Sequence, residues 1–189
     1  LIDDCPMLDA ATVETAYTDP AYGVFTSGTT GTPKLTVVEH AALTVSAAGW
    51  KDILGFSERA RVFQFSAFTF DVAVMDVFFT LLNGGCICMP SEADRMNDLA
   101  GAINRSGATL MSQVPSLFAT IDPASVPTLQ YLVSGGEKMS PAFMEQWKSR
   151  HVVNAYGPSE STVVATVSIK SDGSGELINN DGTDIGVPA

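Results

Sequence analysis

Short apolar stretches alternate with longer segments of helical periodicity along most of the chain. The apolar, β-branched stretches predict strands over 21–27, 34–40, 61–67, 86–90, 109–114, 129–135, 152–157 and 162–170. Apolar residues at helical spacing predict helices over 41–55, 70–85, 92–107, 115–121 and 140–150. Because strands that alternate with helices favour a covered parallel sheet, the pattern predicts an α/β fold with mostly parallel sheets flanked by helices.

Two of these segments carry specific expectations about burial. The helix at 70–85 has apolar residues on nearly every side, so the whole helix is expected to be deeply buried. The strand at 86–90 holds Cys86 and Cys88, and both thiols are expected in the core. The sequence therefore predicts that both segments lie in the interior of the protein.

The composition narrows the class of protein. The chain has 189 residues, which suits one domain or a large piece of one, and a net charge of −11. Nucleic acids and anionic membranes bind cationic surfaces, so neither is expected as a partner. Three cysteines with a single C-x-C pair suit neither a disulfide framework nor a metal site, which favours a reducing, cytoplasmic location.

Both ends of the chain have the composition of a segment from a longer sequence. The first residues are acidic and lack an initial Met, so they do not resemble a signal peptide, and the last ones have loop composition. The longest apolar run, 72–82, is interrupted by Asp76 and is too short to cross a bilayer. We therefore expect part of a larger protein, without a membrane span.

A run of hydroxyls and glycines, FTSGTTGTPKL at 25–35, ends close to a single lysine. Hydroxyls, free backbone N–H groups and a cation are the groups that bind a polyphosphate, and Gly28 and Gly31 let the backbone approach it closely. Pro33 stands where the common phosphate loop has glycine before the lysine, here Lys34, and a strand follows in place of a helix. The stretch favours phosphate binding, with a solvated Thr/Gly turn as the alternative.

Two glycines follow the strand predicted at 129–135, where parallel sheets bind their ligands. Gly135 and Gly136 expose backbone against which a flat ring fits, and Glu137 adds a carboxylate. A plain glycine turn between strand and helix explains the same residues equally well.

A denser motif, NAYGPSE at 154–160, follows the next strand. Tyr156 offers a stacking face for a planar base, and the Asn154 amide both donates and accepts, as an adenine edge requires. Glu160 is a suitable Mg²⁺ ligand beside phosphate oxygens. The alternative is a tight turn with an exposed glutamate.

Asp71 precedes an almost wholly apolar helix segment. Its carboxylate has two possible roles, a helix N-cap or the partner of a ligand cation. No lysine or arginine lies between Arg61 and Arg95, so a ligand ammonium is the group that would supply the missing charge.

In this order and at these distances, FTSGTTGTPK, FDVAVMDVFFTL and NAYGPSE resemble the adenylation domain of nonribosomal peptide synthetases. Such domains belong to the adenylate-forming superfamily, which also holds acyl-CoA synthetases and luciferases. The resemblance spans roughly residues 18–188 and implies a partial large N-terminal domain of that superfamily. It implies one segment, 1–189, with the phosphate loop at 25–35 and an α/β subdomain at about 60–160 for substrate and adenine. The small C-terminal domain and the ribose-binding aspartate would lie beyond residue 189.

The resemblance also implies an activity. Adenylation domains use ATP and Mg²⁺ to convert an amino acid to its aminoacyl-adenylate, with release of pyrophosphate. The aminoacyl group then passes to a phosphopantetheine thiol on a peptidyl carrier domain, and condensation domains of the same synthetase complete the set of partners. Two other readings stay open: a related ligase that makes acyl-CoA or aryl-CoA, and a non-catalytic remnant.

By similarity, particular residues take particular roles. The β- and γ-phosphates would be held by Thr26, Ser27, Gly28, Thr29, Thr30, Gly31 and Lys34. The adenine would be framed by Gly135, Gly136, Glu137, Asn154, Tyr156 and Gly157. Ser159 would lie beside the α-phosphate, Glu160 would hold Mg²⁺, and Asp71 would bind the substrate ammonium. His40 and His151 are interpreted as structural, since this reaction needs no side-chain nucleophile or base.

The resemblance further implies a pocket for the amino-acid side chain. Asp71 would stand at its mouth, and the walls would be formed by Val72, Met75, Ser112, Val133, Gly135, Ala155, Val163 and Val164. No wall residue is charged, so a charged substrate side chain would be desolvated without a partner. We expect a bulky hydrophobic amino acid, aromatic first, with tryptophan ahead of phenylalanine, then leucine. A medium aliphatic residue such as valine is the alternative.

Overall fold

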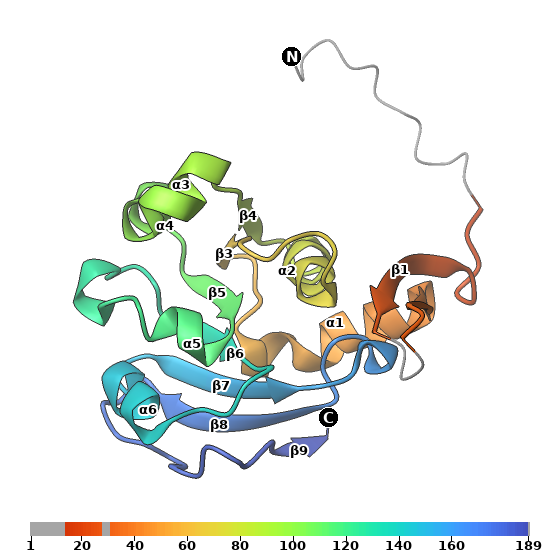
Figure 1. Ribbon diagram of the computed structural model, residues 1–189. Helices are drawn as coiled ribbons and strands as arrows, with labels where there is room; N and C mark the ends of the chain where they lie inside the picture. The colour runs from red at the N-terminus through yellow and green to blue at the C-terminus, as the bar shows by residue number, and fades with distance from the viewer. Residues whose placement is uncertain (1–13, 28–30, 189) are drawn as a thin grey trace.

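A seven-stranded sheet runs through the larger part of the molecule, and a two-stranded hairpin stands apart from it (Figure 1). The computed structural model describes residues 14–27 and 31–188. The sheet has the order β4-β3-β5-β6-β7-β8-β9. Its strands are β3 (Arg61–Phe63), β4 (Cys86–Cys88), β5 (Leu110–Gln113), β6 (Tyr131–Ser134), β7 (His151–Tyr156), β8 (Thr166–Asp172) and β9 (Val187–Pro188). Neighbours from β4 to β7 are parallel, whereas β8 and β9 are antiparallel additions at one edge.

Helices cover both faces of this sheet. They are α1 (His40–Leu54), α2 (Asp71–Leu82), α3 (Glu92–Asn97), α4 (Leu99–Ser106), α5 (Pro115–Phe118) and α6 (Pro141–Trp147). One apolar core joins α1 and α2 to strand residues such as Val62 and Val133, and the other joins α4, α5 and α6 to Phe63 and Leu132. Successive strand residues thus enter opposite cores, as the pleat requires, and the predicted α/β fold with a mostly parallel sheet is confirmed.

The hairpin holds the loop that the sequence marks for phosphate. Strands β1 (Pro20–Thr26) and β2 (Lys34–Glu39) pair in antiparallel fashion, and Thr26 lies opposite Lys34 where the loop begins and ends. Gly28, Thr29 and Thr30 lie outside the described residues. Gly31 has a φ of +81°, a left-handed conformation that suits glycine.

Some predicted bounds are wrong for local reasons. The helix predicted at 92–107 is two helices, because Asp98 leaves the helical conformation and its carboxylate accepts a hydrogen bond from the Gly101 N–H at the start of α4. The strand predicted at 61–67 ends at Phe63, and the one predicted at 162–170 starts only at Thr166. The short β9 was not predicted from the sequence pattern.

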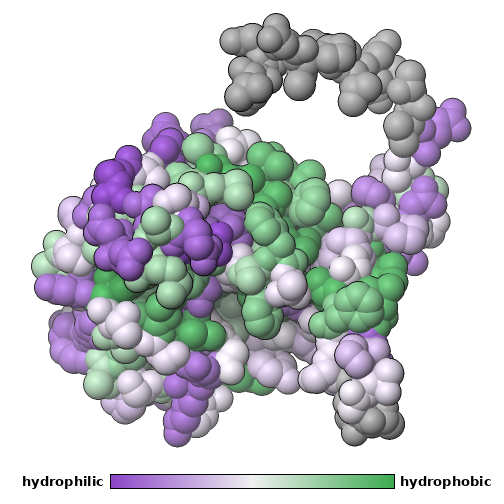
Figure 2. Space-filling view, turned by 45° about the horizontal axis from the view of Figure 1, so that its top comes forward, coloured by the Kyte–Doolittle hydropathy of each residue, from purple (hydrophilic) through white to green (hydrophobic). Residues whose placement is uncertain are grey.

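The expected deep burial of α2 is also wrong. Its inner side packs against α1 and the sheet, but Phe78, Leu81 and Leu82 remain 40%, 57% and 52% exposed. Figure 2 shows apolar side chains gathered over the middle of the molecule, beside a hydrophilic area. Cys88 is buried as expected, whereas Cys86, at the outer edge of the sheet, is exposed.

Candidate active site

A cavity of about 580 Å³ opens where β5, β6 and β7 end and α2 begins. This is the edge at which parallel α/β sheets bind ligands. The cavity brings together all nine residues expected to line a substrate pocket: Asp71, Val72, Met75, Ser112, Val133, Gly135, Ala155, Val163 and Val164. Gly136, Tyr156 and Gly157 line it as well, so the expected side-chain pocket and part of the expected adenine site share one space.

Asp71 does not act as the helix cap. The N-cap of α2 is Phe70, and Asp71 is the first helical residue. Its carboxylate accepts a hydrogen bond of 2.5 Å from the Ser159 hydroxyl, which lies 88 positions further along the chain. No ion pair to Asp71 occurs within residues 14–27 and 31–188. The cavity therefore holds a carboxylate for which the described part of the chain provides a hydroxyl but no cation.

Tyr22 approaches the same carboxylate from the hairpin. Its hydroxyl is buried without a hydrogen-bond partner among the described residues. Burial, and then the charge of Asp71, raise the pKa of Tyr22 to about 12. The sequence analysis missed this residue. Tyr22 and Val24 are two positions apart in β1, so their side chains lie on the same face of the strand. Because Val24 is apolar, this spacing is the sequence signal that Tyr22 faces inward.

One wall of the cavity is a strained turn. Thr162 and Val163 both have positive φ values, of 60° and 75°, which is rare for β-branched residues. Two side chains of α1 hold the turn from behind: the Trp50 Nε1–H donates to the Val164 carbonyl at 3.2 Å, and the Ser46 hydroxyl donates to the Thr162 carbonyl at 3.5 Å. The surrounding packing thus fixes a conformation that the local sequence disfavours.

Two glycines of the cavity are required by the closeness of neighbouring backbone. A Cβ on Gly135 would lie 2.1 Å from the Ala155 carbonyl oxygen, and one on Gly157 would lie 2.4 Å from the Val163 carbonyl oxygen. Real Cβ atoms do not approach backbone so closely. The absence of side chains at these positions therefore allows the neighbouring backbone segments to pack closely, in addition to leaving room for a ligand.

Of the other residues expected around adenine, Tyr156 lines the cavity, whereas the Glu137 and Asn154 side chains bond to other parts of the chain. Tyr156 lines the cavity with a half-exposed ring, free to stack on a planar ligand. Glu137 lies outside the lining, and its carboxylate accepts hydrogen bonds from the backbone N–H and the hydroxyl of Ser116. The Asn154 amide is buried and donates to the Asp184 carbonyl at 2.9 Å. In this structure Glu137 thus bonds to the start of α5, and Asn154 bonds to the chain that leads into β9.

The groups expected near the phosphates come from two elements in contact. Strand β2, which starts at Lys34, packs against the short 3-10 turn Ser159–Ser161. Lys34 and Glu160 are both exposed, and Ser27 and Gly31 share that exposure. The Thr26 hydroxyl donates to the Lys34 carbonyl at 3.4 Å. Hence the end of the loop and the turn that carries Ser159 lie on the same side of the molecule.

The described residues provide no ready-made metal site. Within the described ranges, no three His, Cys, Asp or Glu side chains stand close enough together to hold a metal ion. Glu160 offers a single exposed carboxylate. That donor set fits Mg²⁺ only in company with a polyphosphate, since this ion is usually bound by one or two carboxylates, phosphate oxygens and water.

In the described part of the chain, no helix is both long and apolar enough to cross a membrane.

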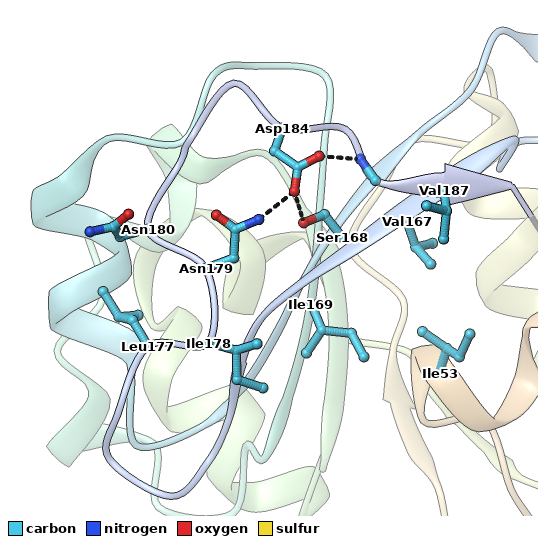
Figure 3. Close-up of a pocket in the computed structure, with 11 residues that line it drawn as sticks. Ile53, Val167, Ser168, Ile169, Leu177, Ile178, Asn179, Asn180, Asp184 and Val187 are labelled. Carbon is cyan, nitrogen blue, oxygen red and sulfur yellow. Dashed lines mark hydrogen bonds between the residues drawn. The ribbon is translucent and has the colours of Figure 1, made fainter.

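A second hollow, beside β8, is lined in part by residues of a hydrogen-bonded network (Figure 3). The Asp184 carboxylate accepts hydrogen bonds from the Ser168 hydroxyl, the Asn179 amide and the Gly186 N–H. The bonds from Ser168 and Gly186, together with the Lys170 ammonium, lower the pKa of Asp184 to about 2. Behind it, the fully buried Lys170 ammonium donates to the carbonyls of Asp181 and Asp184. The network fastens the returning chain to β8, and the Asn154 bond extends it to β7.

Asp76 is the least expected group near the site. Its side chain is fully buried on α2, one position after Met75, and neither carboxyl oxygen has a hydrogen-bond partner among the described residues. Burial raises its pKa to about 8, and the neighbouring Ser112 hydroxyl partly opposes that rise. The carboxyl is therefore held mainly neutral at pH 7.

We expect Asp76→Asn to reduce the loss of stability with rising pH. The carboxyl titrates at its ordinary value near 3.8 when unfolded and at about 8 when folded, so in this window the folded chain binds a proton that the unfolded chain has lost. The wild type is thus fully stabilised below the unfolded pKa and loses stability as pH rises. Between about pH 5.5 and 8 the loss is on the order of 3 kcal/mol, at roughly 1.4 kcal/mol per pKa unit. Urea unfolding at both pH values measures it, and equal losses in wild type and variant would contradict the assignment.

The fold and the cavity define an α/β ligand-binding protein, with a mostly parallel sheet and a cavity at the carboxyl ends of its strands. A family model described as AMP-binding enzyme matches residues 4–188, and the chain belongs to that family. The predicted resemblance is confirmed at this level.

Its relatives are peptide synthetases. Over 166 residues the chain is 51% identical to Nonribosomal peptide synthetase 1 of Aspergillus fumigatus, covering 88% of this chain and 3% of that protein. The adenylation domain AlmE of Vibrio cholerae, solved in complex with glycyl-adenosine-5'-phosphate, is 28% identical with a TM-score of 0.76 over 88% of this chain and 33% of its own. PA1221, an NRPS protein containing adenylation and PCP domains, is 29% identical with a TM-score of 0.74 over 96% and 38%. The chain thus spans a small part of the synthetase and about a third of each solved chain.

Proposed function

We propose that this chain is the central part of an adenylation domain that activates an amino acid with ATP and Mg²⁺, forming an aminoacyl-adenylate and releasing pyrophosphate. The aminoacyl group is then loaded onto the phosphopantetheine of a carrier domain, and a condensation domain uses it in nonribosomal peptide synthesis. Membership of the AMP-binding family and the peptide synthetase relatives support the reaction class. The relative solved with glycyl-adenosine-5'-phosphate supports an amino acid as substrate.

The observation that carries the proposal is the Asp71 carboxylate in the cavity. Its hydrogen-bond partner is the Ser159 hydroxyl, and no described cation pairs with it. The α-ammonium of an amino acid supplies a positive charge that a fatty or benzoic acid lacks. A substrate without that charge would leave a partly buried carboxylate unpaired, which disfavours the alternative acyl-CoA or aryl-CoA ligase.

The remaining residues act by position and charge. With its ammonium on Asp71, the amino acid has its carboxylate near Ser159, the residue proposed to lie beside the α-phosphate. Lys34 and the loop hydroxyls neutralise the outer phosphates, and Tyr156 stacks on the adenine. Mg²⁺, held by Glu160 and the phosphates, supplies further neutralisation of the phosphate charge when it is bound. Holding both reactants in one geometry is the main requirement of such a transfer.

For the substrate side chain we propose a bulky hydrophobic amino acid, aromatic first. Val72, Met75, Val133 and Val164 give the cavity apolar walls, and Met75 adapts to the shape of a ring. The nearest buried carboxyl, Asp76, is held mainly neutral and does not line the cavity, so a lysine or ornithine side chain finds no ion-pair partner in the wall.

We place the protein in the cytoplasm, where free thiols such as Cys86 and Cys88 stay reduced.

Exchange of labelled pyrophosphate into ATP by the full-length synthetase tests the function. We expect exchange that depends on an α-amino acid, strongest with tryptophan, phenylalanine or leucine. A panel that includes fatty acids, benzoic acids, glutamate and lysine provides the comparison. Equal exchange with a benzoic or fatty acid would refute amino-acid activation, and best exchange with glutamate or lysine would refute the apolar pocket.

A further inference from the structure

The segment between β7 and β8, residues 157–165 (the β7–β8 turn), carries both a contact with Asp71 and an unusual backbone. Near the start of the turn, the Ser159 hydroxyl donates to the Asp71 carboxylate at 2.5 Å. Three positions further along, Thr162 and then Val163 have φ values of 60° and 75°. The position of Ser159 beside Asp71 therefore depends on how this turn is held.

The local sequence does not favour the turn. A positive φ brings the Cβ of an L-residue close to the following carbonyl oxygen, and β-branched residues such as Thr162 and Val163 rarely adopt it. Two such residues in succession persist only where the surrounding structure over-determines their conformation. The Ala165 N–H donates to the Tyr156 carbonyl at 2.8 Å and closes the base of the turn. This bond fixes the ends of the turn, and the strained pair between them requires support from another element.

Helix α1 provides that support through two side chains one helical turn apart. The Trp50 Nε1–H donates to the Val164 carbonyl at 3.2 Å, and the Ser46 hydroxyl donates to the Thr162 carbonyl at 3.5 Å. Positions 46 and 50 lie on the same side of the helix, so the two donors meet the carbonyls on either side of Val163. Trp50 is buried, and no residue of α1 lines the cavity. The helix thus holds the turn without touching the space for a ligand.

We infer that Trp50 is a positioning residue for the proposed adenylation: its hydrogen bond keeps the β7–β8 turn in the strained form that brings Ser159 to Asp71. The inference rests on the proposed function, in which Asp71 binds the substrate ammonium and Ser159 lies beside the α-phosphate. When the bond to the Val164 carbonyl is lost, the strained pair is free to return to negative φ, and Ser159 moves with it. Both the amino acid and ATP then meet an incomplete site.

The expected kinetic effect follows from two forms of the turn. Substrates bind only the strained form, so their apparent affinity falls in proportion to the fraction of that form, and saturating substrates restore it. Trp50→Phe removes the N–H donor and keeps an aromatic ring in the core. The measurement is pyrophosphate exchange by the full-length synthetase, with ATP and the amino acid that the wild type exchanges fastest. We expect both KM values to rise roughly 5- to 30-fold, the factor for one residue held at positive φ, with kcat within about twofold.

Trp147→Phe is the matched control. The Trp147 Nε1–H donates to the Phe118 carbonyl at 3.3 Å, and Trp147 is fully buried in the core that joins α4, α5 and α6 to the sheet. Its replacement therefore loses a buried bond of the same kind. A merely structural effect lowers the amount of folded enzyme, and with it kcat, in both variants. The KM values of Trp147→Phe are expected to stay within about twofold of the wild type.

A second substitution tests whether the bond acts against strain. Glycine adopts a φ of 60° without steric cost, so Thr162→Gly makes the turn less dependent on α1. Thr162 does not line the cavity, so the substitution leaves the lining residues in place. In the Trp50→Phe background, Thr162→Gly is expected to return both KM values to within about threefold of the wild type. Ser46→Ala removes the longer of the two bonds, and its expected rise in KM is roughly two- to fivefold.

The outcomes separate the inference from the proposed function. Equal KM values for Trp50→Phe and Trp147→Phe, or a Thr162→Gly substitution that fails to restore KM, overturn the inference while amino-acid activation stands. Should Trp50→Phe not fold, Ser46→Ala decides, and an unchanged KM in that variant overturns the inference. A wild type without amino-acid-dependent exchange refutes the proposed function, and the inference fails with it.

Discussion

Replacing Asp71 with alanine is expected to reduce kcat/KM for the amino acid by roughly 30- to 4,000-fold in pyrophosphate exchange. The range corresponds to the 2–5 kcal/mol lost when one partner of a buried, hydrogen-bonded charge pair is removed. Asp71 lines the cavity and accepts from Ser159, so its loss leaves a bound ammonium without its counter-charge. The KM for the amino acid is expected to rise much more than the KM for ATP.

Asp52→Ala is the matched control for this substitution. Asp52 is an exposed carboxylate on the neighbouring α1 and is absent from the cavity lining, so its removal changes the net charge equally without touching the site. Its kinetics are expected to match the wild type. An Asp71→Ala variant that keeps its affinity for the amino acid would show that the ammonium binds elsewhere.

Replacing Gly135 with alanine is expected to unfold or distort the site, with equal loss of exchange for every amino acid. The added Cβ would meet the Ala155 carbonyl oxygen at 2.1 Å, and a backbone atom cannot rotate away as a side chain does. Strands β6 and β7 are hydrogen-bonded next to this position, where Ser134 pairs with Asn154, so the clash must be relieved by moving a strand. Overpacking of this kind costs typically about 1–3 kcal/mol, and more when the backbone has to shift.

Gly49→Ala gives the contrasting case. Gly49 is an exposed residue within α1, and no described residue beyond its own stretch of helix lies within 4 Å of the position its Cβ would take. Alanine there is expected to stabilise the chain by up to about 1 kcal/mol, because glycine is a poor helix former. Urea midpoints measure both effects. Equal urea midpoints for Gly135→Ala and the wild type would contradict the predicted clash with the Ala155 carbonyl oxygen.

Much of the fold was predictable because its core strands and helices are short, local and apolar. The parallel order from β4 to β7 follows from strands that alternate with helices. The misses depend on individual side chains or on distant pairing. The break at Asp98 arises from one carboxylate that caps α4, and β9 is a strand only because Val187 pairs with Val167.

The candidate site, like the fold, was predictable from the sequence only in part. The resemblance to a known family led us to expect nine of the residues that line the cavity, because a family resemblance carries a spatial arrangement with it. The sequence analysis missed Tyr22 and Asp76, since their importance comes from burial and from neighbours on other elements. It expected Asn154 and Glu137 to frame an adenine, and could not foresee that they also bond to Asp184 and Ser116, 30 and 21 positions away. No local pattern reports such contacts.

The left-handed turn at Thr162 and Val163 limits how the pocket can be redesigned. Val72, Met75 and Ser112 stand on a helix and a strand, so their side chains can be exchanged while the backbone stays in place. Position 163 differs, because any β-branched or bulky residue there keeps the strain of a φ of 75°, and glycine would relax the turn and loosen that wall. A change of substrate preference, by engineering or by evolution, is therefore accessible through α2 and β5, with the strained turn retained as the invariant surface against which new substrates are fitted.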